Sequence, residues 1–260
     1  MIRGLWDRDM VALLLLAALL PVAIFWMIYG GTPTLLRFGL SASVIVAWNA
    51  VFLFARAQVP SFSMLITALA VAMLVPEDLG PFRLILGVSF GIVFGELVFG
   101  GWGRNIINPA TVAVSFIGFG FPGLEWPEFD APVLWATIPA VLIGGLTGVM
   151  PLGVMLGAAL LLIAAFHGGL FPATALSGVA IVFVVLLLDP ATNATTKIGR
   201  WMNGAMFAGL VILFSQAWLG AAPVQYAVAA ALLTNLTAPL LDEIALTAWA
   251  ANRRRRHGKT

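Results

Sequence analysis

The sequence predicts an all-α protein that crosses a membrane many times. Of its 260 residues, 62% are hydrophobic and only 9% are charged, whereas a soluble globular domain carries about 25% charged residues. The mean hydropathy of +1.05 agrees with this prediction. Because the chain has too few charges to cover a globule, its composition excludes a soluble enzyme, a disordered protein and a nucleic-acid binder.

Apolar runs divide the chain into about ten candidate membrane helices, since one such helix needs about 20 apolar residues. The first run follows Arg3 and Arg8 as in a signal peptide, but no small-residue cleavage site follows it, so we expect a retained helix. The sixth and seventh runs meet at Met150 and Pro151, which predicts a tight hairpin or one broken pair. In chain order, the runs cover residues 10–30, 35–55, 61–76, 82–99, 106–121, 132–149, 151–166, 171–188, 201–219 and 222–241.

Charge placement supports ten spans. With the N-terminus inside, eleven of the 13 Lys and Arg residues fall inside, and only Arg37 and Arg83 fall outside. This is the bias that the positive-inside rule requires. We therefore expect both termini to be cytoplasmic and the acidic 122–131 loop to lie outside. The run Arg253–Arg256 indicates a solvated anchor at the lipid surface rather than a nucleic-acid patch.

The residue inventory limits the chemistry that the chain performs alone. It has no Cys, which excludes disulfides and thiolate-held clusters, and its two His are too few for a His-rich metal or haem site. No G-x-G-x-x-G motif lies on a strand, as nucleotide binding by a Rossmann fold would require. We therefore expect no metal site and no catalytic residues, and at most one subunit of an oxidoreductase rather than a complete enzyme.

Two related tetrapeptides lie about eighty residues apart, namely Asn108-Pro109-Ala110-Thr111 and Asp189-Pro190-Ala191-Thr192. Proline removes an amide donor and restricts the residue before it, so both motifs predict broken helices or re-entrant turns. Such backbone survives in lipid only when it is buried in protein or lines a cavity. Corresponding breaks in two halves indicate a binding site between the halves. Two ordinary loops that share a tetrapeptide are the alternative.

Polar residues surround both motifs. Asn105 and Asn108 are three positions apart, so on a helix they share a face, while Thr192 and Thr196 follow Asp189. Asn and Thr side chains hydrogen-bond neutral or hydrated ligands. We expect the three residues Asn105, Asn108 and Asp189, supported by the two threonines, to line one central cavity. Alternatively, Asp189 or Thr196 caps a neighbouring helix.

Glu96 is an acidic residue inside an apolar run. A carboxylate at membrane depth is costly and usually functional, so Glu96 is a candidate for an ion or proton path. It lies about one turn from the cytoplasmic end of its run, so the alternative is that it simply reaches the interface.

These motifs, taken in order, resemble the RnfD/NqrB family. Its members are RnfD, a membrane component of the Rnf electron-transport complex, and NqrB, a membrane component of the sodium-pumping NADH:quinone reductase. The family pattern FGG-x-G-x-N-x-x-NPA is matched by Phe99 to Ala110, and DP-x-T-x-x-x-T-x-x-G-R by Asp189 to Arg200. The stretch NLTAPLLD near the C-terminus is similar to the family's last helix.

The resemblance implies a fold shared with urea transporters, in which ten helices form two related five-helix halves, residues 1–125 and 126–260. It also implies a bacterial inner-membrane protein that passes electrons within a redox complex, in which ion movement accompanies electron transfer. The implied partners are the other subunits, which include FMN-binding or iron–sulfur proteins.

The family's noncovalent riboflavin would be bound by the Asn105/Asn108 and Asp189 segments, where Gly101 and Gly103 permit close approach of the backbone. Family members usually also carry Ser-Gly-Ala-Thr after the fifth helix, where the Thr takes FMN through a phosphoester bond. Here that loop reads FPGLEWPEFDAP, and the nearest string, Ala175 to Ala180, lacks the Thr. We therefore expect a noncovalent riboflavin or FMN and no covalent FMN.

Two other functions fit the same features. One is a small-solute transporter or channel, since the implied fold is shared with urea transporters. The other is a cofactor-free membrane anchor for a partner flavoprotein. Flavin absorbance bands favour electron transfer, and solute uptake by a colourless protein favours the transporter. A protein with neither property favours the anchor.

Overall fold

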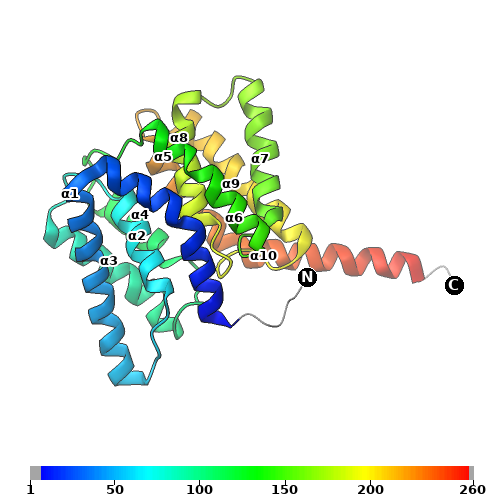
Figure 1. The fold of residues 1–260 in the computed structure, drawn as a ribbon. Coiled ribbons are helices and arrows are strands. Elements are labelled where there is room, and N and C mark those ends of the chain that lie inside the picture. The colour runs from blue at the N-terminus through cyan, green and yellow to red at the C-terminus, as the bar shows by residue number, and fades with distance from the viewer. Residues whose placement is uncertain (1–6, 258–260) are drawn as a thin grey trace.

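The computed structural model describes residues 7–257, and every regular element in this range is helical, so the all-α prediction is confirmed. Figure 1 shows the helices packed into one bundle from which the end of α10 projects. The elements of the first half are α1 (Arg8–Arg56), α2 (Ser63–Leu74), α3 (Pro81–Gly95), η1 (Leu97–Phe99) and α4 (Pro109–Gly120). They are followed by α5 (Ala131–Trp135), α6 (Thr137–Thr147), α7 (Leu152–His167), η2 (Ala173–Ala175), α8 (Leu176–Val182), η3 (Phe183–Leu187), α9 (Lys197–Ala217) and α10 (Pro223–His257).

The first two expected spans form α1, where a sharp reversal joins them. The backbone leaves helical geometry at Gly31, with φ 63° and ψ −150°, a region that glycine reaches without a Cβ clash. Thr34 supports the reversal by donating its hydroxyl to the Gly31 carbonyl, at 2.7 Å. The two arms therefore return to the same end of the bundle (Figure 1), where Arg8 donates to the carbonyl of Val59 at 3.5 Å.

Each remaining expected span also contains a helix, but several of these helices are short. Only four helices in the described range are long and apolar enough to cross a membrane by themselves. The other apolar helices have 10–17 residues. Among them, α5 and α6 adjoin at Ala136, and η3 is a π-type turn. The total of ten crossings stays a prediction.

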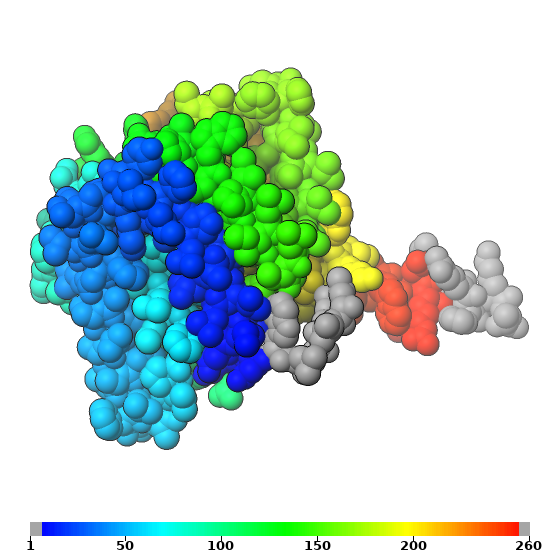
Figure 2. Space-filling view, viewed as in Figure 1, coloured from blue at the N-terminus to red at the C-terminus, as the bar shows by residue number. Residues whose placement is uncertain are grey.

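The last helix is longer than its apolar run predicts. α10 continues beyond residue 241 to His257, since the Ala, Leu and Arg residues that follow have high helix propensity. Its C-terminal part stands apart from the bundle (Figures 1 and 2). There Trp249 is 57% exposed, and the Arg253 guanidinium lies over its ring, 5.3 Å from the ring centroid.

Two short segments form the interior of the bundle. Most residues of α2 and of the stretch Val179–Leu188 are buried. α2 packs against α1 and α4, while α8 packs against α5 and α10. A buried helix end leaves backbone groups that protein partners must satisfy, because lipid offers none. Both segments therefore need polar partners where they end.

Glycine seams bring the helices of each half into close contact. Along α3, Gly87, Gly91 and Gly95 face α4, and a Cβ on Gly95 would lie only 2.7 Å from the Cα of Pro109. In the second half, Gly157 of α7 and Gly204 of α9 play the same part between α7 and α9. Small residues permit such close backbone approach in membrane bundles. The first seam holds the end of α3 against the start of α4.

Helices of the two sequence halves also pack on one another. α6 lies against α1, and α10 lies against α4. These contacts place the C-terminal helix beside the start of the helix that follows the NPAT motif. The division into halves at residue 125 stays a prediction.

The close packing of α3 on α4 predicts that a single methyl group added at Gly91 lowers the stability of the protein. In Gly91→Ala the new Cβ would meet the Pro109 carbonyl oxygen at 2.7 Å and the Cα of Ala113 at 2.8 Å. Such overpacking costs about 1–3 kcal/mol. We expect a lower midpoint of thermal unfolding for the purified protein in detergent. Gly39→Ala is the matched control, since a Cβ there meets nothing within 4 Å. Equal midpoints for the two variants would contradict the close packing of α3 on α4.

Candidate functional site at the meeting of two broken helices

Asn108 connects three parts of the fold. It is the N-cap of α4, and its side-chain oxygen accepts from the N–H groups of Ala110 (2.9 Å) and Thr111 (3.3 Å). Its side-chain amide donates to a carboxylate oxygen of Asp189, at 3.0 Å. Its own backbone N–H donates to the side-chain oxygen of Asn235 on α10, at 3.2 Å. Because Pro109 holds the first helical position, which needs no donor, this start of α4 is complete.

Asp189 follows the π-type turn and is buried. One carboxylate oxygen accepts from Asn108, and the other accepts from the backbone N–H of Ala191 at 3.0 Å. The Asn193 side chain donates to the carbonyls of Asp189 (2.7 Å) and Leu187. These bonds satisfy the backbone where the buried segment ends. The NPAT and DPAT motifs therefore meet directly, although they are 81 residues apart in the chain.

Glu96 lies next to this meeting point and is also buried. It ends α3, and its carbonyl accepts from the N–H of Phe99 and of Gly101, each at 3.1 Å. The neighbouring Gly95 packs on Pro109, which directly follows Asn108. We call the group Glu96, Asn108, Asp189, Thr192 and Asn235 the polar centre.

The polar centre contains buried groups without a hydrogen-bond partner among residues 7–257. These are Glu96 Oε2, Thr192 Oγ1 and Asn235 Nδ2. Two further atoms close to it in the chain, Thr111 Oγ1 and Asn203 Oδ1, are in the same condition. Leaving a buried polar group unpaired costs about 1–3 kcal/mol. The centre therefore offers both donors and acceptors to a water, an ion or a ligand.

Asn105, Gly101 and Gly103 shape the loop before Asn108. The Asn105 side chain accepts from the N–H of Gly103 (2.9 Å) and donates to the carbonyl of Ile107 (3.1 Å). Gly101 and Gly103 have φ values of 96° and 88°, which favour glycine. The amide of Asn105 is thus used within its own loop, whereas that of Asn108 reaches the second motif.

Thr196 acts as a helix cap. Its hydroxyl accepts from the N–H of Gly199 at 3.0 Å and so caps α9, as the capping alternative in the sequence predicts. The same hydroxyl donates to Asp242 on α10, at 2.6 Å. Asp242 also accepts from the Thr195 hydroxyl and from the N–H groups of both threonines, at 2.7–2.9 Å. This carboxylate therefore holds the second loop against α10.

Sequence reasoning assigned no role to Asn235 and Asp242, although both lie in the stretch NLTAPLLD. They are seven positions apart, which is two helical turns, so they share one face of α10. Asn235 meets the first motif, and Asp242 meets the loop that follows the second. Polar residues at this spacing in an otherwise apolar helix are the signal that identifies them. Asn193 and Asn203, which hydrogen-bond each other at 2.7 Å, carry no comparable pattern.

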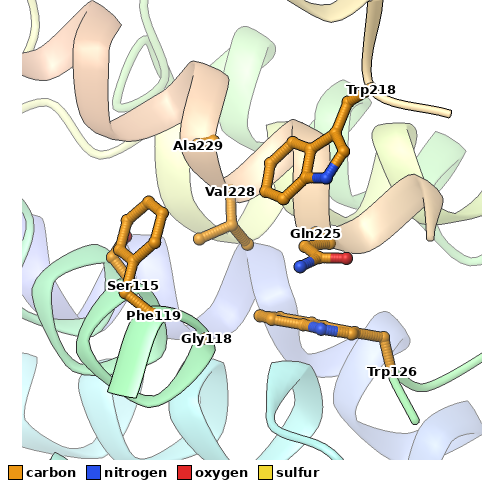
Figure 3. A pocket seen from close by; sticks show the side chains of 8 residues that line it. All are labelled: Ser115, Gly118, Phe119, Trp126, Trp218, Gln225, Val228 and Ala229. Atoms are coloured by element: carbon orange, nitrogen blue, oxygen red, sulfur yellow. The ribbon is translucent and has the colours of Figure 1, made fainter. Parts of the chain in front are cut away.

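A small pocket lies at the opposite end of α4 from Asn108. Figure 3 shows the Gln225 side chain between the indoles of Trp126 and Trp218, with Ser115 and Phe119 to one side. The space open to water is about 10 Å³, which is about one water molecule. This pocket is too small for a flavin ring, so the polar centre remains the candidate site.

Asp242→Asn tests the contact between the second loop and α10. An amide keeps one acceptor oxygen but turns an NH₂ group toward N–H and O–H donors, so about half of the four hydrogen bonds are lost, at about 1 kcal/mol each. We expect a lower midpoint of thermal unfolding. The neighbouring Glu243 is exposed, so Glu243→Gln should leave the midpoint unchanged and serves as the control. A stable Asp242→Asn variant would show that the loop is held in another way.

Comparison with known proteins identifies the family to which the chain belongs. The family model described as the NQR2, RnfD, RnfE family matches residues 5–137. The B subunit of the Na(+)-translocating NADH-quinone reductase of Haemophilus influenzae (strain PittEE) is 25% identical, over 84% of this chain and 67% of the relative. The corresponding proteins of Stutzerimonas stutzeri (strain A1501) and Pseudomonas aeruginosa (strain LESB58) are each 24% identical, over 77% and 81% of this chain. The chain spans 64% and 66% of those two relatives, about two thirds of their length. This multi-pass membrane protein belongs to the NQR2, RnfD, RnfE family.

Proposed function

We propose that the chain is a membrane subunit of an Nqr- or Rnf-like redox complex and that it passes electrons through a noncovalently bound flavin at the polar centre. Its partners would be other subunits of that complex, including FMN-binding or iron–sulfur proteins. Membership of the family supports the role as a membrane subunit of a redox complex. The buried groups of the polar centre that lack a hydrogen-bond partner support the proposed flavin binding.

The chemistry of these groups fits the polar edge of a flavin ring, which presents carbonyl acceptors and an N–H donor. Asn235 Nδ2 and Thr192 Oγ1 are available donors, and Glu96 Oε2 is an available acceptor. Asn and Thr side chains suit such a neutral edge because they donate and accept without a net charge. A flavin bound here would remove the cost of leaving these atoms unpaired.

An open apolar groove, which runs along α4 from Ile107 to Gly120 and is lined by no residue of the polar centre, has the size for the ring. Its volume is about 480 Å³, and Ile107, Phe116 and Leu232 are among the residues that line it. Phe90 and Phe116 stack in its wall with their ring centroids 4.4 Å apart. Ligand pockets of about 300–1,000 Å³ with apolar walls and a few polar groups are typical of cofactor sites. The groove reaches Ile107, which directly precedes Asn108.

Each residue of the polar centre has a separate role in this proposal. Asn108 orients Asp189, since its side chain donates to that carboxylate while its oxygen is held by the α4 N-terminus. Asp189 supplies a negative charge near the ring, which lowers its affinity for electrons. Asn235 brings α10 to the same point. When bound, the flavin supplies the capacity to take up and release electrons.

Glu96 is the proposed residue for ion or proton movement. It is a buried carboxylate with one oxygen unpartnered within the described chain. Such a group at membrane depth pairs with a cation or a proton. Its chain neighbour Gly95 packs on Pro109 beside Asn108, so a positive charge at Glu96 would lie near the proposed flavin.

The proposed orientation is that the ends of α1 face the cytoplasm of a bacterium, in its inner membrane, with both termini on that side. Arg8, Arg56 and Arg104 gather around one cavity at this end of the bundle. Glu77, Glu128 and Asp130 line another cavity. The second cavity also holds Arg37, so the charged groups that line the first are cationic alone and those that line the second are mainly acidic, which fits the positive-inside rule.

Asn108→Leu and Asp189→Leu test the flavin site. Each removes the hydrogen bond that joins the two motifs, so the purified variants should retain less than about a tenth of the wild-type flavin, which corresponds to about 1.4 kcal/mol. Visible absorbance and flavin extraction measure this content. Asn49→Leu is the control, because Asn49 is equally buried but donates only within α1, to the Ile45 carbonyl at 2.9 Å. Full flavin content in both Leu variants would place the flavin elsewhere.

Asp189→Asn gives a second measurement that does not depend on loss of the flavin. It keeps the size of the side chain but removes a negative charge, so the midpoint potential of the retained flavin should become more positive. An unchanged potential would separate Asp189 from the flavin. A wild-type protein that is colourless and passes a small solute in liposomes would favour the transporter function instead.

The lack of Ser-Gly-Ala-Thr predicts a further result. A phosphoester-linked flavin survives a denaturing gel and fluoresces there, whereas a noncovalent flavin is released. We expect no fluorescent band at the mass of this chain, even after coexpression with a flavin transferase. A relative of this family with the Ser-Gly-Ala-Thr sequence is the positive control. A fluorescent band would mean that another Thr accepts FMN.

A further inference from the structure

Three arginines converge on an open cavity at the end of the bundle where α1 begins and ends. The cavity has a volume of about 390 Å³, and Arg8, Arg56 and Arg104 line it together with Gln58 and Gly100. The arginines come from the start of α1, the end of α1 and the loop after η1. Neither the family motifs nor the proposed flavin site accounts for this cluster.

The backbone holds the three segments together. The reversal at Gly31 returns the end of α1 to its start. Gln58, just beyond that end, joins the loop after η1 when its side-chain oxygen accepts from the Gly101 N–H (2.6 Å) and its nitrogen donates to the Leu97 carbonyl (3.3 Å). Gly100 has a φ of 103°, and a Cβ there would lie 3.2–3.3 Å from the Arg104 side chain. The absence of a side chain at Gly100 therefore leaves room for Arg104 to lie against the loop.

The positive charge of this cluster is not balanced by ion pairs inside the described chain. Over residues 7–254, the one ion pair joins Arg37 and Glu77, near the reversal of α1 at Gly31. The two nearest acids in sequence, Asp7 and Asp9, are not among the residues that line the cavity; they accept from the N–H of Arg8 and from the Ser61 hydroxyl (3.1 Å). Arg56 lies over the ring of Phe52, 5.5 Å from its centroid. The cavity therefore presents a net positive charge.

The chemistry points to a phosphate group. Planar guanidinium groups bind phosphate oxygens through pairs of charge-assisted hydrogen bonds, and basic pockets between membrane helices bind anionic headgroups. Val59, which lines the cavity, is 67% exposed, and Phe54 near the end of α1 is 88% exposed. A soluble phosphate gains nothing from them, whereas acyl chains do. We propose that this cavity binds the phosphate of an anionic phospholipid, with the acyl chains lying along the end of α1.

The experiment compares lipid retention in native mass spectrometry. The purified full chain is mixed with equal amounts of phosphatidylglycerol, which is anionic, and phosphatidylcholine, which has no net charge. Wild-type protein should retain phosphatidylglycerol preferentially. In the double variant Arg56→Gln/Arg104→Gln, retention of phosphatidylglycerol should fall about tenfold or more, since each guanidinium contributes charge-assisted hydrogen bonds. Arg56→Lys/Arg104→Lys keeps the charge but loses the paired hydrogen bonds of the guanidinium. Its retention of phosphatidylglycerol should lie between that of the wild type and that of the double Gln variant.

Arg83→Gln is the control, because Arg83 lies at the other end of α3 over the ring of Phe121, 5.2 Å from its centroid. It removes the same charge and should leave lipid retention at the wild-type level. Equal retention of the two lipids by the wild type, or equal losses in the control and the double variant, would overturn the proposal. Binding of inorganic phosphate that displaces phosphatidylglycerol at low millimolar concentration would assign the cavity to a soluble phosphate and overturn the lipid assignment. If the double variant does not fold, competition by inorganic phosphate and the lipid preference of the wild type decide the question.

Discussion

The hydrogen bond between Asn108 and Asp189 satisfies a constraint that membrane burial places on broken helices. A helix that begins or ends inside the bundle leaves N–H and carbonyl groups that lipid cannot satisfy. Here α4 begins and η3 ends within the protein. Asn108 and Asp189 each accept from a backbone N–H of their own segment, and the Asn108 side-chain amide donates to Asp189, which joins the two segments. The glycine seam along α3 allows the start of α4 to come close, and Asn235 adds a partner from the last helix. The buried backbone is thereby satisfied, while several side-chain atoms keep hydrogen-bonding capacity for a ligand.

The loop from Glu96 to Arg104 connects two features with different chemistry. Its first residue belongs to the buried polar centre, and its last residue lines the cationic cavity at the end of the bundle. The N–H of Gly101 donates to the Glu96 carbonyl, so the two ends of this loop cannot move independently. An anion held by the arginines would therefore also restrain the backbone of Glu96. One short segment therefore contributes residues both to the cationic cavity and to the polar centre.

Much of the fold and the central pair of the site could be predicted from the sequence, because proline, glycine and apolar runs have strong local effects. The two Pro-containing motifs predicted breaks, and Asn108 and Asp189 do lie together at them. Thr196 caps α9, as the alternative interpretation of the sequence predicted. The N–H groups at a helix start need an acceptor whether or not a ligand lies nearby. The role of Asn235 depends on how α10 packs against α4, which no local pattern states. The π-type turn of η3 likewise corresponds to no local feature of its apolar run.

The contact between Asn108 and Asn235 has a consequence for biosynthesis. The two residues are 127 positions apart, so at about 5–20 residues per second the ribosome needs roughly 6–25 s to make the second after the first. During this interval the N–H of Asn108 has no partner from α10 and must stay hydrated or bound by the insertion machinery. The start of α4 is completed only when the last helix has entered the membrane. A chain that stops before α10 therefore carries, at the start of α4, a backbone amide without the partner that the complete fold gives it.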